Sequence, residues 1–480
     1  MSDSGTGDRQ LDLAGARSLA ASVQRLLRAA GEQVEEANAR SPLVTRLTDH
    51  LGCPFPDVLT VEQTYRIWEH ASLQRGIDAY LAGHSPDAEW FGISGADRRF
   101  ESLDSMLTGA LRTGGFQLGR PDYATAATGA AETMEVVELG LVTTAGPDGT
   151  PIVVGMQSTA AYDEQCVLTV FAKERATARA VRDEVDRLKD EHDVLRGRFV
   201  SFTASEHNEN ELVTFLPRQG PAATDVILPD GRLEGIESHI VGIAEHAERL
   251  LAAGQHLKRG LLLHGPPGVG KTHTVRYLIG RLSGYTVVQL TGHAVRFLDQ
   301  AVALARRLQP AVIVLEDVDL VAEGRESHDS SPLLFSLLDA MDGLAEDANV
   351  VMVLTTNRVN VLERALTERP GRVDLAVEIP RPDAAGRLRL LRLYARDLRI
   401  EADLDRMVTA TEGVTASFIK EMLRRAVLTA LREAETVEAL TDAHFEAALA
   451  GMTAPGQSLT PGLLGAPLDD PDDLRHEDDS

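Results

Sequence analysis

The clearest hydrophobic pattern lies between residues 256 and 380, where short apolar runs alternate with amphipathic stretches. Near-continuous apolar runs suit parallel strands covered on both faces, and the amphipathic stretches suit the crossover helices that connect such strands. The pattern therefore predicts an α/β fold built on a five-stranded parallel sheet. The five strand candidates are GLLLH at 260–264, TVVQL at 286–290, AVIVLED at 311–317, NVVMVLTT at 349–356 and LAVEIP at 375–380.

The pattern changes after the segment PRPD. Apolar residues then recur at three- and four-residue spacing, as in AAGRLRLLRLYARDL and SFIKEMLRRAVLTALREAE. This periodicity predicts a helical domain at 383–452, which follows a core domain at 225–382. The last stretch is rich in Pro, Gly, Asp and Ser and has few apolar residues to bury, so 453–480 is predicted to be a disordered acidic tail.

The amino-terminal half shows two different sequence patterns. Residues 11–40 and 61–82 carry amphipathic helix patterns, which predict a helical region at 1–128. Short runs rich in Val and Thr follow, with the turn AGPDGT between two of them and a charged helical stretch before the last. This mixture predicts a small α/β domain at 129–224.

Composition narrows the class of protein. A chain of 480 residues with 43% hydrophobic content is long enough for two or three buried cores. Its net charge of −25 argues against a protein that holds nucleic acid through its overall field. The start lacks a basic region followed by an apolar core, and no apolar stretch is long enough to cross a membrane. A cytoplasmic location is therefore expected.

Metal and disulfide chemistry have little support in the sequence. Cys53 and Cys166 lie far apart without metal-ligand spacing, which favours a reducing compartment. His207, Glu209 and Glu211 share one polar stretch, but such stretches are far more often solvated surface than metal sites. The chain has no His-Glu-x-x-His helix, which excludes a zinc peptidase of that type.

The strongest chemical signal is GPPGVGKT at 265–272, which matches the phosphate-binding pattern G-x-x-x-x-G-K-T, or Walker A. It follows an apolar strand and precedes a helical stretch, so glycine amides and the helix amino terminus can face phosphate oxygens. The Lys would neutralise the β and γ phosphates, and the Thr hydroxyl would bind Mg²⁺. The predicted ATP-binding residues are Gly265, Pro266, Pro267, Gly268, Val269, Gly270, Lys271, Thr272 and His273.

A second signal is the apolar strand VIVLEDVD at 312–319, which ends in acids. After a phosphate loop this Walker B-like strand resembles the AAA family of the AAA+ superfamily of ATPases. The family usually ends the strand in Asp-Glu, whereas this chain has Glu316-Asp317, similar to the mitochondrial Bcs-type AAA proteins. The resemblance implies that Glu316 is a Mg²⁺ ligand with Thr272, and that Asp317 activates the attacking water. Alone, the segment would be a capped strand end with solvated acids.

The resemblance continues in order along the chain. TTNR at 355–358 resembles the sensor strand end and places Asn357 near the γ phosphate. LERALTERPGRVD resembles the region whose two arginines, here Arg369 and Arg372, reach a neighbouring subunit's nucleotide. EGVTASFIKEM resembles the segment of the helical lid that closes over the adenine.

The lid match places small residues at Ala416 and Ser417. Tyr394 is expected either to touch the ribose or base or to belong to the lid core. The family's unfoldases usually carry an aromatic pore loop after the second strand, and this chain has only TGHAVRFLDQAVALARRL there. Phe297 could replace that aromatic, but a helical pattern favours core packing, so threading of a polypeptide is in doubt.

The resemblance implies an ATP- and Mg²⁺-dependent, chaperone-like remodeller of proteins or protein complexes that works as a homo-oligomeric ring, expected to be a hexamer. Residues 1–224 would then select a protein substrate or adaptor. A slowly hydrolysing, nucleotide-controlled scaffold is the alternative, favoured by the short Asp317 side chain and the missing pore loop. A nucleic-acid motor is disfavoured by the net charge.

Overall fold

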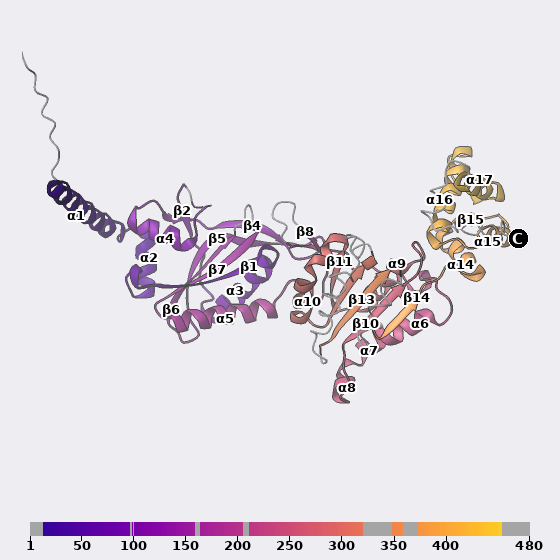
Figure 1. Cartoon of the computed structure of the whole chain (residues 1–480), viewed down its shortest axis with the longest axis horizontal. Helices are drawn as coiled ribbons and strands as arrows, with labels where there is room; N and C mark the ends of the chain where they lie inside the picture. Colours follow the sequence, from indigo (N-terminus) through magenta and orange to yellow (C-terminus); the bar gives the residue numbers. More distant parts are fainter. Residues whose placement is uncertain are drawn as a thin grey trace, which may run out of the picture. The chain divides into compact units, whose positions relative to one another are not determined.

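The computed structural model describes residues 13–96, 98, 100–158, 164–204, 211–319, 348–358 and 373–453. Contacts between Cα atoms divide the chain into two compact units, Met1–Val194 and Leu195–Ser480 (Figure 1). This division lies between the boundaries predicted near residues 128 and 224. Among the described residues, no helix is both long enough and apolar enough to cross a membrane.

The first unit is built on an antiparallel sheet with strand order β1-β7-β6-β5-β4. Alternate residues of β5 and β6 are buried on opposite faces, where two separate cores form. Helices α3 and α5 cover one face, and α2 and α4 cover the other. The strands are β1 (Leu59–Arg66), β2 (Gly92–Ser94), β3 (Gln117–Gly119), β4 (Asp122–Ala127), β5 (Thr133–Ala145), β6 (Pro151–Ser158) and β7 (Gln165–Ala172). The α-helices are α1 (Leu13–Asn38), α2 (Pro42–Leu51), α3 (His70–His84), α4 (Leu103–Arg112) and α5 (Arg175–Glu191).

The prediction of an all-helical region at 1–128 is wrong, because β1 to β4 lie inside it. The predicted helix at 61–82 begins only at His70, and the residues before it form β1, which pairs with β7. The sequence LTVEQTYR is rich in β-branched and aromatic residues, which favour a strand. Its Tyr65 is buried and donates a hydrogen bond to Asp186 of α5 at 2.7 Å.

The second unit contains a seven-stranded sheet, within the described residues, in the order β14-β10-β13-β12-β11-β8-β9. The strands from β14 to β8 pair in parallel, and β9 pairs antiparallel with β8. The five predicted strands are β10 to β14. The sheet also contains β8 and β9, so the predicted number of five strands is corrected to seven. The strands are β8 (Phe199–Ala204), β9 (Glu211–Phe215), β10 (Arg259–His264), β11 (Thr286–Thr291), β12 (Ala311–Glu316), β13 (Val350–Thr356) and β14 (Leu375–Glu378).

Strands β8 and β9 had been assigned to the small α/β domain. Residues just before β8 attach to the core sheet: Val287 donates its backbone N–H to Arg198 at 2.8 Å, and Gly197 donates to the Thr286 hydroxyl at 3.0 Å. Because β8 then pairs with β11 from Phe199 onward, the sheet extends past the predicted boundary.

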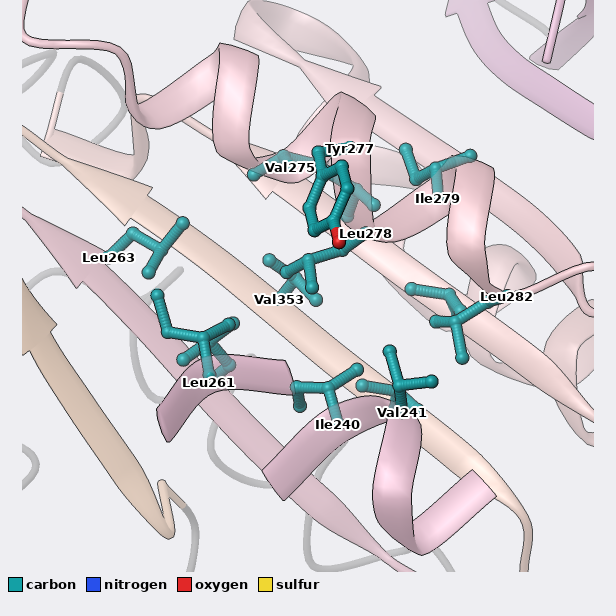
Figure 2. Packing of buried hydrophobic residues seen from close by; sticks show 14 of the residues in the cluster. Ile240, Val241, Leu261, Leu263, Val275, Tyr277, Leu278, Ile279, Leu282 and Val353 are labelled. Atoms are coloured by element: carbon teal, nitrogen blue, oxygen red, sulfur yellow. The ribbon is translucent and has the colours of Figure 1, made fainter. Parts of the chain in front are cut away.

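Both faces of this sheet are covered. Figure 2 shows Leu278 and other side chains of α9 packed against Leu261 and Val353 of the strands, with Ile240 and Val241 alongside. Helix α10 packs against β11 and β12. The helical elements are α6 (Arg232–Glu237), the π-helical turn η4 (Ser238–Gly242), α7 (Ile243–Glu245), α8 (Ala247–Ala252), α9 (Lys271–Arg281), the 3₁₀ turn η5 (Gly292–Phe297) and α10 (Leu298–Arg307).

The last described segment is largely helical and has its own core, which includes Leu391, Phe418, Met422 and Phe445. Side chains start its helices: Asp383 and Thr415, for example, accept hydrogen bonds from first-turn backbone N–H groups. The elements are α14 (Ala384–Ala395), β15 (Arg399–Ile400), α15 (Leu404–Ala410), α16 (Ala416–Glu433), β16 (Ala439–Leu440) and α17 (Asp442–Thr453). The predicted tail lies outside the described residues, apart from the end of α17.

Candidate functional site

The glycine-rich loop connects the end of β10 to the start of α9. Gly265, Gly268 and Gly270 have φ angles of +142°, +77° and +111°, which side chains rarely allow. A Cβ added to Gly265 would lie 2.1 Å from the carbonyl oxygen of Ile379, which follows β14. Nothing lies within 4 Å of a Cβ added to Gly270. Glycine therefore lets the loop pass close to the sheet while its turn stays open.

The remaining loop residues divide between core and surface. Val269 is buried in the main core, whereas Thr272 and His273 are exposed in the first turn of α9. Thr274 is fully buried and donates its hydroxyl to the carbonyl of Gly270 at 3.1 Å. The free N–H groups at the start of this helix, together with the positive end of its dipole, suit an anion beside the loop.

Lys271 reaches from the loop to the end of β13. Its Nζ donates hydrogen bonds to the carbonyls of Gly265 and Pro266, at 2.8 and 2.9 Å, and to Oδ1 of Asn357 at 2.8 Å. The side chain is buried, which lowers the pKa of its ammonium group, while the charges of Asp317 and Asp319 oppose that shift. A positive charge is thus held beside the loop by neutral oxygens, where an anion would be strongly attracted.

Two acids follow at the end of β12. Burial, with the charge of Asp317, raises the pKa of Glu316, and a hydrogen bond with Thr272 opposes the rise. Gln289 of β11 donates to Glu316 at 3.1 Å. The backbone N–H of Asp317 donates to the Thr355 hydroxyl at 3.0 Å, and the φ angle of Asp317 is +51°. The two carboxyl groups therefore lie on the same end of the sheet as the glycine loop.

Asn357 connects these groups. Besides accepting from Lys271, it donates through Nδ2 to Asp317 at 3.3 Å. Its backbone N–H donates to Asp319 at 3.0 Å, and Asp319 also accepts the Thr356 hydroxyl at 3.0 Å. Asp319 is only 5% exposed, so its carboxylate holds the end of β13 from inside.

Gln289 and Asp319 were missed by the sequence analysis. Gln289 is a polar residue in an otherwise apolar strand, and Asp319 is the third acid of EDVD. Both signals were visible, but their roles depend on which strands lie side by side.

The carboxy-terminal helical segment touches the loop through α16. The backbone N–H of Ser417 donates to the carbonyl of Gly268 at 3.0 Å, and a Cβ added to Gly268 would lie 2.9 Å from the Ser417 hydroxyl. Ala416 is buried beside it. Tyr394 packs against the core of this segment and also lines a pocket of 480 Å³ with Ser417 and Lys420. Packing against the core of this segment agrees with the second of the two positions expected for Tyr394, and contact with the ribose or base stays a prediction.

Some predicted residues are not at this site or cannot be placed there. Phe297 is 5% exposed and packs against Phe202 of β8, with ring centroids 6.4 Å apart, which confirms the expectation of core packing. Arg369 and Arg372 lie outside the described residues, as do His207 and most of its polar stretch. In the part of the chain that the structure describes, no cluster of His, Cys, Asp and Glu could hold a metal ion by itself.

The arrangement suits a phosphate chain with a divalent cation. The loop offers backbone N–H groups and a buried ammonium group for phosphate oxygens. A hydroxyl from Thr272 and a carboxylate from Glu316 are oxygen donors of the kind Mg²⁺ prefers, and Mg²⁺ commonly takes its other ligands from water and phosphate. Two protein oxygens are therefore sufficient for such a site.

Comparisons with known proteins identify a family for the part of the chain that carries this site. Residues 261–381 match the model of the ATPase family associated with various cellular activities (AAA). Relatives include the ATP-dependent zinc metalloprotease FtsH 2 of Symbiobacterium thermophilum, 29% identical over 51% of this chain and 45% of its own. The 26S proteasome regulatory subunit 6A of Encephalitozoon cuniculi is 30% identical over 43% of this chain and 55% of its own. The 26S proteasome regulatory subunit 8 homolog of Schizosaccharomyces pombe is 29% identical over 53% of this chain and 70% of its own. The chain spans about half the length of the first two.

Proposed function

The chain carries an ATPase domain of the AAA family, and from this premise we propose that it binds ATP with Mg²⁺ and hydrolyses it to ADP and phosphate. The observation that carries the proposal is the convergence of Lys271, Glu316, Asp317 and Asn357 at one end of the sheet, beside three glycines with positive φ. Each group has a use in phosphoryl transfer, where catalysis is mostly positioning and charge stabilisation.

The roles follow from chemistry and position. The loop amides and Lys271 bind the phosphates. Thr272 and Glu316 would hold Mg²⁺, which would neutralise phosphate charge when bound. Asp317 accepts a proton from the attacking water, as its place beside Asn357 allows. Asn357 orients that water, and Asp319 holds Asn357 through its backbone.

The wider biology is proposed from the relatives. The proteasome regulatory subunits and FtsH carry names that connect AAA domains with protein degradation, so we assign this chain an action on proteins or protein complexes. It would work in the cytoplasm as a ring, expected to be hexameric, in which Arg369 and Arg372 reach a neighbour's nucleotide. Residues 1–224 would bind the substrate or adaptor, and the segment at 383–452 would act as the lid. The peptidase activity in the name FtsH is not carried over, because this chain has no His-Glu-x-x-His.

A second candidate is a nucleotide-controlled scaffold that turns over slowly. It is favoured by two observations: Asp317 is one methylene shorter than the usual Glu, and Phe297 is buried where unfoldases present an aromatic side chain. Misplacing a catalytic group by about one bond length can slow a reaction substantially. Such a protein would still bind ATP and assemble.

Turnover measurements separate the two candidates. In a phosphate-release assay, Asp317→Ala is expected to lower kcat by about 100-fold, the usual contribution of a general base. Arg369→Ala should have a similar effect if the ring completes the site. Asp299→Ala, at an exposed position of α10, is the matched control and should be unchanged. A wild type no faster than Asp317→Ala would establish the scaffold instead.

The raised pKa of Glu316 predicts a pH-dependent need for magnesium. A carboxyl group with a raised pKa becomes protonated at a higher pH than an ordinary Glu and then loses its affinity for a cation. The Mg²⁺ concentration for half-maximal turnover should therefore rise as the pH falls from neutral to mildly acidic. Glu316→Gln should need more Mg²⁺ throughout and show a smaller pH dependence. Equal pH dependence in the variant and the wild type would contradict this assignment.

A further inference from the structure

Helix α16 carries an exposed stripe on the side away from the core of the helical segment. Lys420, Arg424, Leu428 and Leu431 follow one another at spacings of three and four residues, which places them on one side of the helix. Leu428 and Leu431 are 45% and 47% exposed. The stripe therefore has a basic half and an apolar half on the same side of one helix.

The pocket of 480 Å³ beside Tyr394 adjoins the basic half of this stripe. Three cations and one carboxylate line it. Glu421 pairs with Arg424 at 2.7 Å. Lys420 lies over the ring of Tyr394, 5.9 Å from its centroid, and neither Lys420 nor Arg396 makes a hydrogen bond or ion pair with the described residues. The pocket thus holds an excess of positive charge in a chain whose net charge is −25. Its apolar lining comes from Leu398, Leu423 and Val427.

The residues that follow α17 have the matching chemistry. Near the end of α17 the carbonyl of Gly451 accepts a hydrogen bond from Arg425 of α16 at 3.3 Å, so the chain leaves α17 beside α16. Residues 454–480 then carry seven acids against one Arg. Apolar residues are concentrated in LLGAPL at 463–468, and DDPDD follows directly at 469–473. The tail therefore has an apolar part next to an acidic part, as the stripe has an apolar half next to a basic one.

Length and order also fit. The chain between Thr453 and Leu463 spans about 30 Å when extended, whereas Lys420 and Leu431 are only about 16 Å apart along the helix axis. A tail that runs opposite in direction to α16 brings LLGAPL to the apolar half first and DDPDD to the basic half next. A segment with little to bury by itself can become ordered on a surface that supplies apolar contacts and opposite charge.

We propose that residues 463–473 dock on this stripe of the same chain, with LLGAPL over Leu428 and Leu431 and DDPDD over Lys420 and the pocket. The tether keeps the effective concentration of the tail on the order of millimolar, so weak contacts are sufficient. A second copy of the stripe fits less well. A parallel pair of stripes sets basic half against basic half, and an antiparallel pair sets basic half against apolar half. Nucleic acid would be repelled by the net charge of the chain.

Disulfide trapping tests the docking in the full-length protein without nucleotide, so that its outcome is independent of ATP binding. Leu431→Cys is combined with Leu463→Cys, and oxidation is followed on non-reducing gels. We expect a crosslink within one chain that forms about tenfold faster than in the matched control, because docking raises the local concentration of one thiol near the other.

The control combines Ala447→Cys with Leu463→Cys. Ala447 is an exposed position of α17 that lies close to the start of the tail, and Cys53 and Cys166 are buried in wild type. Equal rates in the two proteins would show that the tail samples both helices without docking. Crosslinks between two chains only would show that the stripe binds another copy's tail. Either result overturns the proposal.

Charge reversal tests the basic half of the contact. Lys420→Glu with Arg396→Glu should slow the crosslink about tenfold, since it replaces attractive surface contacts with repulsive ones. Exchanging the four Asp of DDPDD for Lys in the same protein should restore the rate. Lys173→Glu with Arg175→Glu, at exposed positions of the first unit, makes the same change in net charge and should leave the rate unchanged. If circular dichroism shows folded protein and the rate does not fall on reversal, or the exchange does not restore it, the proposal is overturned.

Discussion

Lys271→Ala is expected to lower kcat/KM for ATP by about 1,000-fold or more, since even one lost hydrogen-bond donor to a developing charge commonly costs a factor of 100 to 1,000. Lys271 is a full charge, is 6% exposed, and is held by three oxygen acceptors. Burial leaves the ammonium group poorly solvated, which lowers its pKa, and a poorly solvated cation gains strongly from a phosphate beside it. Phosphate release measures the loss of turnover, and calorimetric titration with ATP and Mg²⁺ measures the loss of affinity.

The control for this prediction is Lys173→Ala, which removes the same charge from an exposed position of the first unit. It should leave both the turnover and the heat of ATP binding unchanged. If Lys271→Ala kept wild-type affinity and turnover, the phosphate site would have to lie elsewhere in the chain. If wild type gave no heat with any adenine nucleotide, the proposed function itself would fail.

The core strands could be predicted from sequence because their signal is local. The runs at 260–264 and 286–290 agree with β10 and β11 to within one residue at each end. Most of their residues are apolar, as burial under helices on both faces requires. A continuous apolar run that is followed by the polar start of a helix leaves few structures other than a buried strand for such a segment.

The strands outside the core could not be placed in the same way. LTVEQTYR is short and mixed, and it becomes β1 because β7, a hundred residues later, offers an edge to pair with. The last Val- and Thr-rich run of the predicted small α/β domain contains β8, but nothing in its sequence shows that β11 is its neighbour. Pairing partners are non-local, so the sequence indicated an extended segment without indicating its sheet.

The same difference between local signals and non-local contacts holds at the candidate site. The phosphate loop and the residues Glu316, Asp317 and Asn357 follow from motifs whose order carries the information. Asp319 and Gln289 act through neighbours on other strands, so their importance appears only when β11, β12 and β13 lie side by side. A motif thus predicts which groups gather beside the loop better than it predicts which groups hold them in place.

The closeness of loop and sheet leads to the second large expected effect. Gly265→Ala should destabilise the second unit by about 3 kcal/mol or more, because overpacking and a forbidden backbone conformation each cost about 1–3 kcal/mol. The new Cβ would lie 2.1 Å from the carbonyl oxygen of Ile379, at a φ of +142°. That carbonyl belongs to the backbone and cannot rotate away as a side chain could. Urea unfolding followed by circular dichroism measures the loss.

Gly235→Ala is the matched control for the change at Gly265. Gly235 lies in α6, has no atom within 4 Å of an added Cβ and has no positive φ, so Ala should leave stability unchanged or raise it by up to about 1 kcal/mol. Equal stability of the Gly265→Ala and Gly235→Ala proteins would contradict the close approach of the loop to the end of β14. If Gly265→Ala were destabilised and still bound ATP with wild-type affinity, the loop would tolerate a shift away from Ile379, and the glycine would serve the fold more than the ligand.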